Sequence, residues 1–216
     1  MHGTLRRMHS GPRPAGTTLD QFRLNALVTS IAFGGRRRRV YRQVTALSGT
    51  GPGDRVLDVG CSSGYLTRLL AAAAGPTGAV TGLDPSEAAI AYARRRGPAG
   101  PEYVVGVAQD LSAFPDGTFD VVTSTLAVHH VPARKRQQAV REMLRVTRPG
   151  GRLLIADFDP AGPVMPLHRG AARMKHAAAS TGPLDELAAA AGYQVEAQGT
   201  LPLLRYVVAV RPDQAP

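Results

Sequence analysis

The chain has 216 residues, of which 44% are hydrophobic and 19% are charged, with one cysteine and no tryptophan. A chain of this length can bury a core that needs no disulfide or metal framework, and the lone Cys61 excludes an intramolecular disulfide. The formal net charge of +10 raises the question of nucleic acid or acidic lipid as a partner. Because only Lys135 and Lys175 are lysines, the arginine-rich coding bias of a GC-rich genome explains the charge equally well.

The N-terminal region lacks the apolar run of a signal peptide, and no apolar stretch of about 18 residues occurs elsewhere. The sequence therefore predicts a cytoplasmic protein without a membrane span. Residues 1–18 are rich in Gly, Pro and Arg without a hydrophobic period, which predicts a flexible arm before a single domain over 19–216. Within 19–50, helical spacing of apolar residues predicts two helical pieces, broken at Gly34 and Gly35.

From residue 55 onward, strand and helix patterns alternate. Repeated βα units of this length predict a parallel sheet with helices on both faces. Beyond the irregular segment 158–183, a helix and two apolar runs predict a hairpin-like pair that completes a seven-stranded sheet with an antiparallel C-terminal strand. The expected strands are 55–59, 79–83, 103–106, 119–124, 152–156, 193–198 and 201–210, and the expected helices are 65–74, 86–96, 134–146 and 184–191.

The most informative segment is VLDVGCSSGY, at residues 56–65. Here a strand carries Asp58 near its end, small residues make a turn and a helix begins, so the backbone can pass close to a ligand. Asp84, in GLDPSEAA, closes the next expected strand, and Asp110, in AQDLSAFP, follows the third. Carboxylates at the ends of three successive strands indicate a nucleoside site that has no basic phosphate cradle.

The sequence also argues against two other kinds of nucleotide site and against a zinc site. The dinucleotide fingerprint G-x-G-x-x-G needs glycines where Ser62 and Tyr65 stand, and no Gly-Lys-Ser/Thr follows as it would in a P-loop. No Cys/His spacing is typical of a zinc site. We therefore expect no bound metal.

Four segments together resemble the class I S-adenosylmethionine-dependent methyltransferases over roughly residues 50 to 160: VLDVGCSSG, GLDPSEAAIAYAR, AQDLSAFPDGTFDVVTSTLAVHHV and LRVTRPGGRLLIADF. The stretch RLNALVTSIAFGGRRRRVYRQV is similar, more loosely, to the segment before the first motif in ubiquinone/menaquinone-biosynthesis C-methyltransferases. The resemblance implies a Rossmann-like, doubly wound α/β fold. It also implies S-adenosyl-L-methionine as cofactor, with S-adenosyl-L-homocysteine as product.

The resemblance assigns the methionine part of the cofactor to the turn after the first strand. The residues against which it would lie are Gly60, Cys61, Ser62 and Gly64. Asp58 would orient the turn and the cofactor's amino group. The family usually has glycine where Ser62 stands, and the serine hydroxyl could add a contact there.

The resemblance places the rest of the cofactor across the ends of the following strands. Asp84, followed by Pro85, would hold the ribose. Asp110 would accept a hydrogen bond from the adenine amino group, with Leu111 packed on the base. The residues that would line the sulfonium are Thr125 and Leu126.

Methyl transfer from a sulfonium is an in-line displacement, so most of the acceleration comes from holding the nucleophile about 3 Å from the methyl group. A general base is needed only where the acceptor must lose a proton. His129 and His130 follow the fourth strand and are candidates for that base; alternatively, they only line the cofactor. Asp157 and Asp159 are further candidates, although Asp157 could simply end the fifth strand.

Segment 158–183 is where such folds usually build the acceptor pocket, and it contains the substrate candidates His168, Arg173 and His176. The alternative is a surface loop with incidental histidines. The four arginines at 36–39 would either surround an anionic acceptor or form a solvated helix face. The basic runs at 94–96 and 134–136 are expected to be solvated.

We therefore predict an S-adenosylmethionine-dependent methyltransferase that acts on a small apolar or aromatic, quinone-like acceptor by C- or O-methylation. One alternative is a cofactor-binding homologue that catalyses a non-methylating reaction or serves as a partner protein. The other is an RNA methyltransferase, which only the charge favours, so nucleic acid is not the expected partner. The sequence leaves open whether the protein forms a homodimer.

Overall fold

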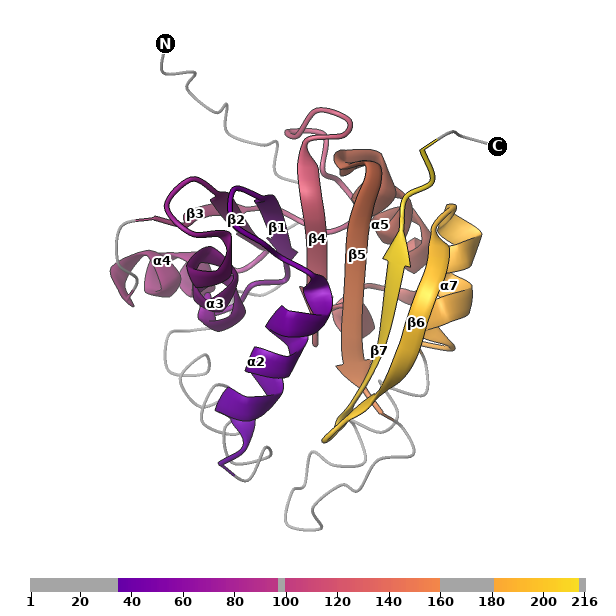
Figure 1. The fold of residues 1–216 in the computed structure, drawn as a ribbon, viewed down its shortest axis with the longest axis horizontal. Coiled ribbons are helices and arrows are strands. Elements are labelled where there is room, and N and C mark those ends of the chain that lie inside the picture. Colours follow the sequence, from indigo (N-terminus) through magenta and orange to yellow (C-terminus); the bar gives the residue numbers. More distant parts are fainter. Residues whose placement is uncertain (1–34, 97–99, 160–180, 214–216) are drawn as a thin grey trace.

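The structure, a computed structural model, describes residues 35–96, 100–159 and 181–213. Its strands form one seven-stranded sheet in the order β3-β2-β1-β4-β5-β7-β6 (Figure 1). Neighbouring strands are parallel except where β7 pairs with β5 and with β6. The predicted sheet, mostly parallel with an antiparallel C-terminal strand, is confirmed. The strands are β1 (Arg55–Val59), β2 (Ala79–Asp84), β3 (Glu102–Val105), β4 (Phe119–Thr125), β5 (Thr147–Phe158), β6 (Gln194–Leu201) and β7 (Leu204–Val210).

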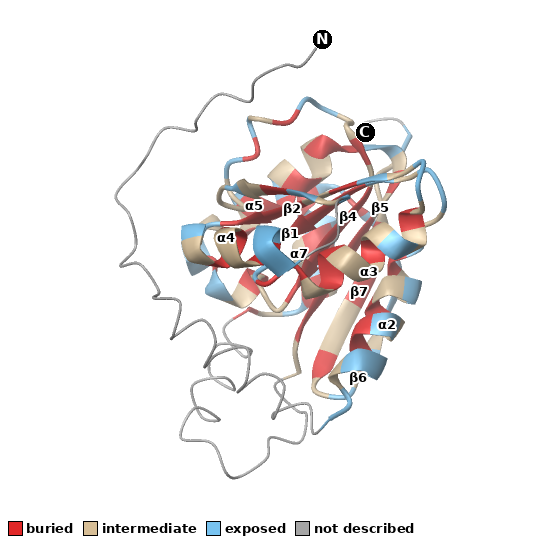
Figure 2. Cartoon of the chain, turned by 90° about the vertical axis from the view of Figure 1, so that its left-hand side faces the viewer, coloured by how far each residue is buried: buried red, intermediate tan, exposed pale blue. Residues whose placement is uncertain are grey.

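Helices cover both faces of the sheet, and the buried residues lie in the strands and on the inner sides of these helices (Figure 2). Val56 packs in the cluster that includes α2 and α3, whereas Leu57 packs in the cluster that includes α5 and α7. Because both faces are covered, strands at the centre of the sheet need apolar residues at successive positions, as in Val56-Leu57 of β1 and Leu153–Ala156 of β5. The helices are α2 (Arg37–Ser48), α3 (Tyr65–Ala74), α4 (Glu87–Arg96), α5 (Ala133–Val146), α7 (Leu184–Ala191) and the short 3₁₀ helix η1 (Val128–His130).

One expected helical piece is untested, and several strands begin or end at other residues than expected, most clearly β5. The first helical piece expected within 19–50 lies outside the described residues, and the second begins at Arg37. β5 begins at Thr147, earlier than the expected Arg152. The Pro-Gly-Gly stretch between them indicates a turn, but Gly150 and Gly151 exchange backbone hydrogen bonds of 2.8 Å with Arg211. A partner from the far end of the chain thus extends the strand, which no local pattern indicates.

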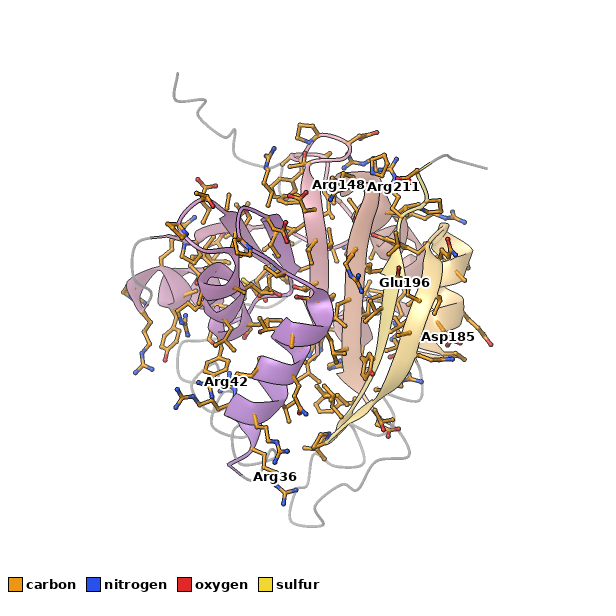
Figure 3. The ribbon with its side chains drawn as sticks, viewed as in Figure 1. Arg36, Arg42, Arg148, Asp185, Glu196 and Arg211 are labelled. Atoms are coloured by element: carbon orange, nitrogen blue, oxygen red, sulfur yellow. The ribbon has the colours of Figure 1, made fainter. Side chains whose placement is uncertain are left out.

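The parallel strands β1, β2, β4 and β5 end at one edge of the sheet, the lower edge in Figure 1. The first turn of α2 reaches the same edge, where Figure 3 labels Arg36. In open α/β sheets this edge is where ligands bind. The fold therefore gathers the turn after β1, Asp84 at the end of β2 and Thr125 at the end of β4 on one side of the molecule.

The buried carboxylate of Asp58 connects three of the elements at this edge. Asp58 is 1% exposed. Its Oδ2 accepts a 2.7 Å hydrogen bond from the hydroxyl of Thr67 on α3, and its Oδ1 accepts a 3.1 Å hydrogen bond from the hydroxyl of Thr123 on β4. Burial raises the pKa of Asp58 to about 6, although the two hydroxyls lower it in part. Ionisation of the buried Asp58 carboxyl therefore lowers the stability of the cofactor-free fold.

We expect Asp58→Asn to change how the stability of the cofactor-free protein depends on pH. Because the pKa of Asp58 is higher in the folded protein than in the unfolded chain, its contribution to stability is fully present at a pH below the ordinary carboxyl pKa. That contribution is lost as the pH rises through about 6. The difference between the two pKa values corresponds to about 3 kcal/mol. The free energy of unfolding of Asp58→Asn, relative to the wild type, should therefore increase between pH 4 and pH 7 in urea titrations.

Parallel profiles for the wild type and Asp58→Asn would contradict the assignment of a raised pKa to Asp58.

Candidate active site

The turn between β1 and α3 has no room for side chains at two positions. Gly60 has a φ of 80°, and a Cβ there would overlap the side chain of Ala127, which follows β4. Gly64 has a φ of 68°, and a Cβ there would overlap the Tyr103 hydroxyl on β3. Only glycine satisfies both the left-handed backbone and the contact. Ser62 also has a positive φ, of 51°, which is the geometry of the glycine that the resemblance leads us to expect there.

Asp84 holds this turn against the start of the next helix. Its Oδ2 accepts a 2.9 Å hydrogen bond from the backbone N–H of Ser62, and its Oδ1 accepts one of 2.9 Å from the N–H of Ser86. Asp84 is 9% exposed. Burial raises its pKa, and the two backbone N–H groups lower it in part. Pro85, the residue after Asp84, is exposed.

Cys61 belongs to the packing of the turn. It is buried in a small cluster with Ile90, Ala93 and Tyr103. A Cβ added at Gly82 would lie 2.9 Å from its Sγ, so the thiol fills the space that this glycine leaves. Burial raises the pKa of the thiol well above its usual range, an effect to which the nearby Asp58 adds. A protonated, buried thiol does not act as a nucleophile.

Asp110 and Leu111 lie in the connection between β3 and β4, with different surroundings. Asp110 is exposed, and its Oδ1 accepts a 3.2 Å hydrogen bond from the N–H of Ser112. The Ser112 side chain and N–H lower the pKa of Asp110. Leu111 is fully buried in the larger core cluster, and its N–H donates a 2.9 Å hydrogen bond to Glu142 Oε2 on α5. Asp110 is thus open to a ligand, whereas Leu111 belongs to the core.

Thr125 and Leu126 end β4 at the ligand-binding edge. Thr125 is 8% exposed, and its buried hydroxyl has no hydrogen-bond partner among the residues that the structure describes. A buried hydroxyl without a partner is costly, so it marks a place where a ligand atom can be accommodated. Leu126 has a φ of 57° and donates its N–H to the carbonyl of Ala156, 2.8 Å away. This backbone turns the chain sharply into η1.

His129 and Asp157 form a buried pair, although they are 28 positions apart. His129 Nδ1 lies 2.6 Å from Asp157 Oδ1, and the side chains are 6% and 0% exposed. The same carboxylate accepts backbone hydrogen bonds from His129, at 3.0 Å, and from Phe158, at 2.8 Å. A carboxylate accepts but does not donate, so Nδ1 carries the hydrogen of this pair, and in the neutral imidazole the lone pair is then on Nε2.

The residues around this pair include Arg136, which corrects one expectation, and the second candidate base, His130. Arg136, expected to be solvated, is 7% exposed and donates to the carbonyls of Val131, at 3.0 Å, and His129, at 3.3 Å. The arginine thus donates hydrogen bonds to carbonyls that the short helix η1 leaves without a hydrogen-bond donor. His130 is exposed, with its ring 4.0 Å from that of His129.

The acceptor candidates His168, Arg173 and His176 lie outside the described residues. Arg36, Arg38 and Arg39 are exposed. The Arg37 guanidinium lies 4.5 Å from the ring centre of Tyr65, the first residue of α3, so one member of the arginine run is fixed beside the turn.

The described residues contain no group of three His, Cys, Asp or Glu that could hold a metal ion. Over the same residues, no helix is long and apolar enough to cross a membrane. The carboxylates beside the turn after β1 are Asp58 and Asp84, and each is hydrogen-bonded by hydroxyls or backbone N–H groups. Such a site favours a ligand that carries positive charge.

Comparisons with known proteins agree with this geometry. Residues 57–155 match the family model described as "Methyltransferase domain". The ubiquinone/menaquinone biosynthesis C-methyltransferase UbiE of Ectopseudomonas mendocina is 39% identical over 140 residues, which are 63% of this chain and 54% of the relative. The chain thus spans about half the length of the curated relatives that it matches.

Solved structures share the fold at low sequence identity. A SAM-dependent methyltransferase from Aquifex aeolicus superposes with a TM-score of 0.66 at 20% identity, over 79% of this chain and 88% of that one. The [4+2]-cyclase SpnF superposes with a TM-score of 0.65 at 21% identity, over 81% of each chain. Residues 57–155 of this chain thus match a methyltransferase domain and are similar in sequence to UbiE, and the chain shares its fold with S-adenosylmethionine-dependent methyltransferases.

Proposed function

We propose that this protein transfers the methyl group of S-adenosyl-L-methionine to a carbon or oxygen of a small, apolar, quinone-like acceptor. Its similarity to UbiE supports the class of acceptor. The observation that carries a base-assisted transfer is the buried His129–Asp157 pair beside the end of β4, which would present Nε2 of the neutral imidazole to the acceptor.

The residues of the site fit the proposed cofactor. Gly60 and Gly64 give the turn its left-handed backbone, packed on Ala127 and Tyr103, and the methionine part of the cofactor would lie against this turn. Asp84 would hold the ribose, since each of its oxygens accepts one N–H and has a further lone pair. The unpartnered hydroxyl of Thr125 would lie beside the sulfonium, and Asp110 would accept from the adenine amino group.

The carboxylates suit the charge of this cofactor. Burial raises the pKa values of both Asp58 and Asp84, so a bound cation would stabilise their ionised forms. The bound cofactor supplies an electrophilic methyl group on a positively charged sulfur. The protein's own contribution is then to place the acceptor in line with that group and to exclude water.

His129 would act as the general base. Its Nδ1–H is fixed on Asp157, so Nε2 can accept the proton of an acceptor hydroxyl as the nucleophile attacks. The proton remains on the imidazole, and the carboxylate of Asp157 stabilises the resulting positive charge. In this proposal Asp157 positions the base and is not the base itself.

The direct test is methyl transfer from labelled cofactor by the wild-type chain. The acceptors would be simple phenols, hydroquinones lacking a ring methyl group and carrying short prenyl chains, and total RNA. We expect label in the hydroquinones, bound to carbon or oxygen. Label only in RNA would support the RNA methyltransferase alternative instead, and cofactor binding without any transfer would support the non-methylating alternative.

Loss of the Asp84 carboxylate should abolish measurable cofactor binding. In Asp84→Ala both the proposed ribose acceptor and the anchor of the Ser62 N–H disappear. Calorimetric titration with S-adenosyl-L-homocysteine should give a Kd at least roughly 100-fold higher than in the wild type. Asp185→Ala on α7, on the other side of the molecule in Figure 3, should bind normally. Unchanged affinity in Asp84→Ala would exclude the ribose assignment.

His129→Gln should lower kcat by roughly 100-fold or more, with little change in cofactor affinity, because a general base contributes at this scale. The deficit should shrink for phenols that are already ionised at the assay pH. Asp157→Asn should lower kcat as well, and the double variant should be no slower than His129→Gln alone, since the two residues act as one unit. Additive losses in the double variant would contradict this arrangement.

The oligomeric state, the cytoplasmic location and the division into an arm and one domain stay predictions. Size-exclusion chromatography with light scattering measures the first directly.

A further inference from the structure

One side of α5 is hydrogen-bonded along its length to the connection between β3 and β4. Gln138, Glu142 and Arg145 are spaced by four and three positions, so they share one stripe of the helix. Gln138 Nε2 donates a 2.9 Å hydrogen bond to the carbonyl of Gln109. Glu142 Oε2 accepts the N–H of Leu111 at 2.9 Å. The stripe thus contacts the residues on both sides of Asp110.

Arg145 makes the most contacts of this stripe. Its Nη2 donates to the carbonyl of Leu111 at 2.8 Å, and its Nη1 donates to the carbonyl of Phe114 at 2.9 Å. Nη1 also lies 2.7 Å from Asp116 Oδ1. The same guanidinium binds Glu142 through two hydrogen bonds of 2.9 Å. A planar guanidinium can satisfy this set of acceptors together, whereas an ammonium cannot.

Glu142 and Arg145 therefore hold Leu111 from both sides of its peptide unit. The carboxylate takes the N–H and the guanidinium takes the carbonyl. The Arg145 side chain lowers the pKa of Glu142, which keeps it as an ionised acceptor. Charge-assisted hydrogen bonds of this kind are stronger than neutral ones. The backbone next to Asp110 is thus fixed by a helix that lies outside the site.

The end of α5 that carries this pair is itself anchored. Arg211 Nη1, just after β7, donates to the carbonyls of Leu144 at 3.1 Å, Arg145 at 3.0 Å and Thr147 at 2.6 Å. These carbonyls belong to the last turn of α5 and the residue after it, where the helix leaves acceptors unsatisfied. Arg211 therefore holds in place the end of α5 that carries Glu142 and Arg145.

We infer that Glu142 and Arg145 are positioning residues for the adenine-binding part of the site, holding the connection at residues 109–116 so that the Asp110 carboxylate faces the base. This inference rests on the proposed cofactor site. Glu142 and Arg145 would then contribute to the affinity for the cofactor without touching it. The reason is that a connection already ordered loses less conformational entropy when the cofactor binds.

Arg145→Lys and Glu142→Gln test the inference, with Arg141→Lys as the matched control. Arg141 is exposed on the same helix. Arg145→Lys keeps the charge but loses the planar set of donors, and Glu142→Gln keeps an acceptor for Leu111 but loses the charge. We expect roughly tenfold higher Kd values for both S-adenosyl-L-homocysteine and adenosine. KM for the cofactor should rise equally, and kcat at saturating cofactor should stay within about twofold of the wild type.

Amide hydrogen exchange supplies the second measurement. In cofactor-free Arg145→Lys the amides of residues 109–116 should exchange faster than in the wild type, and saturating cofactor should restore most of the protection. If Arg145→Lys does not fold, Glu142→Gln carries the same test.

Two results would overturn the inference. One is a lower Tm in both variants with unchanged Kd values for the nucleoside, which is the signature of a purely structural pair. The other is equal behaviour of Arg145→Lys and Arg141→Lys. Failure of the wild-type chain to bind either ligand would instead contradict the proposed function itself, so the two failures are distinguishable.

Discussion

The turn between β1 and α3 is packed so tightly that the arrangement of the site depends on it. Its two glycines face Ala127 after β4 and Tyr103 on β3, and the N–H groups of Gly60 and Cys61 both donate to the carbonyl of Leu83 on β2. One turn therefore contacts β2, β3 and the segment just after β4. Since the ends of these strands also carry Asp84 and Thr125, fixing the turn fixes the distances between the groups that would hold the cofactor.

The local sequence predicts what depends on local rules. The apolar runs of β1 and β4, the glycine turn and the order of strands follow from burial on both faces and from βα alternation. Asp84 could be placed because an acidic residue at a strand end has a fixed position relative to the sheet edge. The hairpin-like pair β6 and β7 was likewise marked by its turn residues and apolar spacing.

What could not be predicted comes from contacts between distant residues. His129 and Asp157 are both candidate bases from their places at strand ends, but their hydrogen bond joins η1 to the end of β5, and nothing in the local sequence pairs them. Arg136 stands in a basic run that reads as solvated, yet it is buried because η1 leaves carbonyls for it to satisfy. The early start of β5 depends on Arg211, near the other end of the described chain. In each case the deciding partner is remote in sequence.

α5 links these parts of the molecule. In its first turn, Arg136 donates to the carbonyl of His129, and in its last turns Glu142 and Arg145 hold Leu111. A single helix thus contacts the backbone at His129, the proposed general base, and at Leu111, next to the proposed adenine contact Asp110. Its rigidity makes the separation of these two regions insensitive to motions of the surface around them.

The only cysteine of the chain lies inside the turn on which the site depends. Because Cys61 is buried and the pKa of its thiol is raised, a thiol reagent can reach it only when the turn opens. The rate of its modification therefore measures how often the turn opens, with no label or substitution introduced. A packing residue thereby becomes an intrinsic reporter of local unfolding at the centre of the fold.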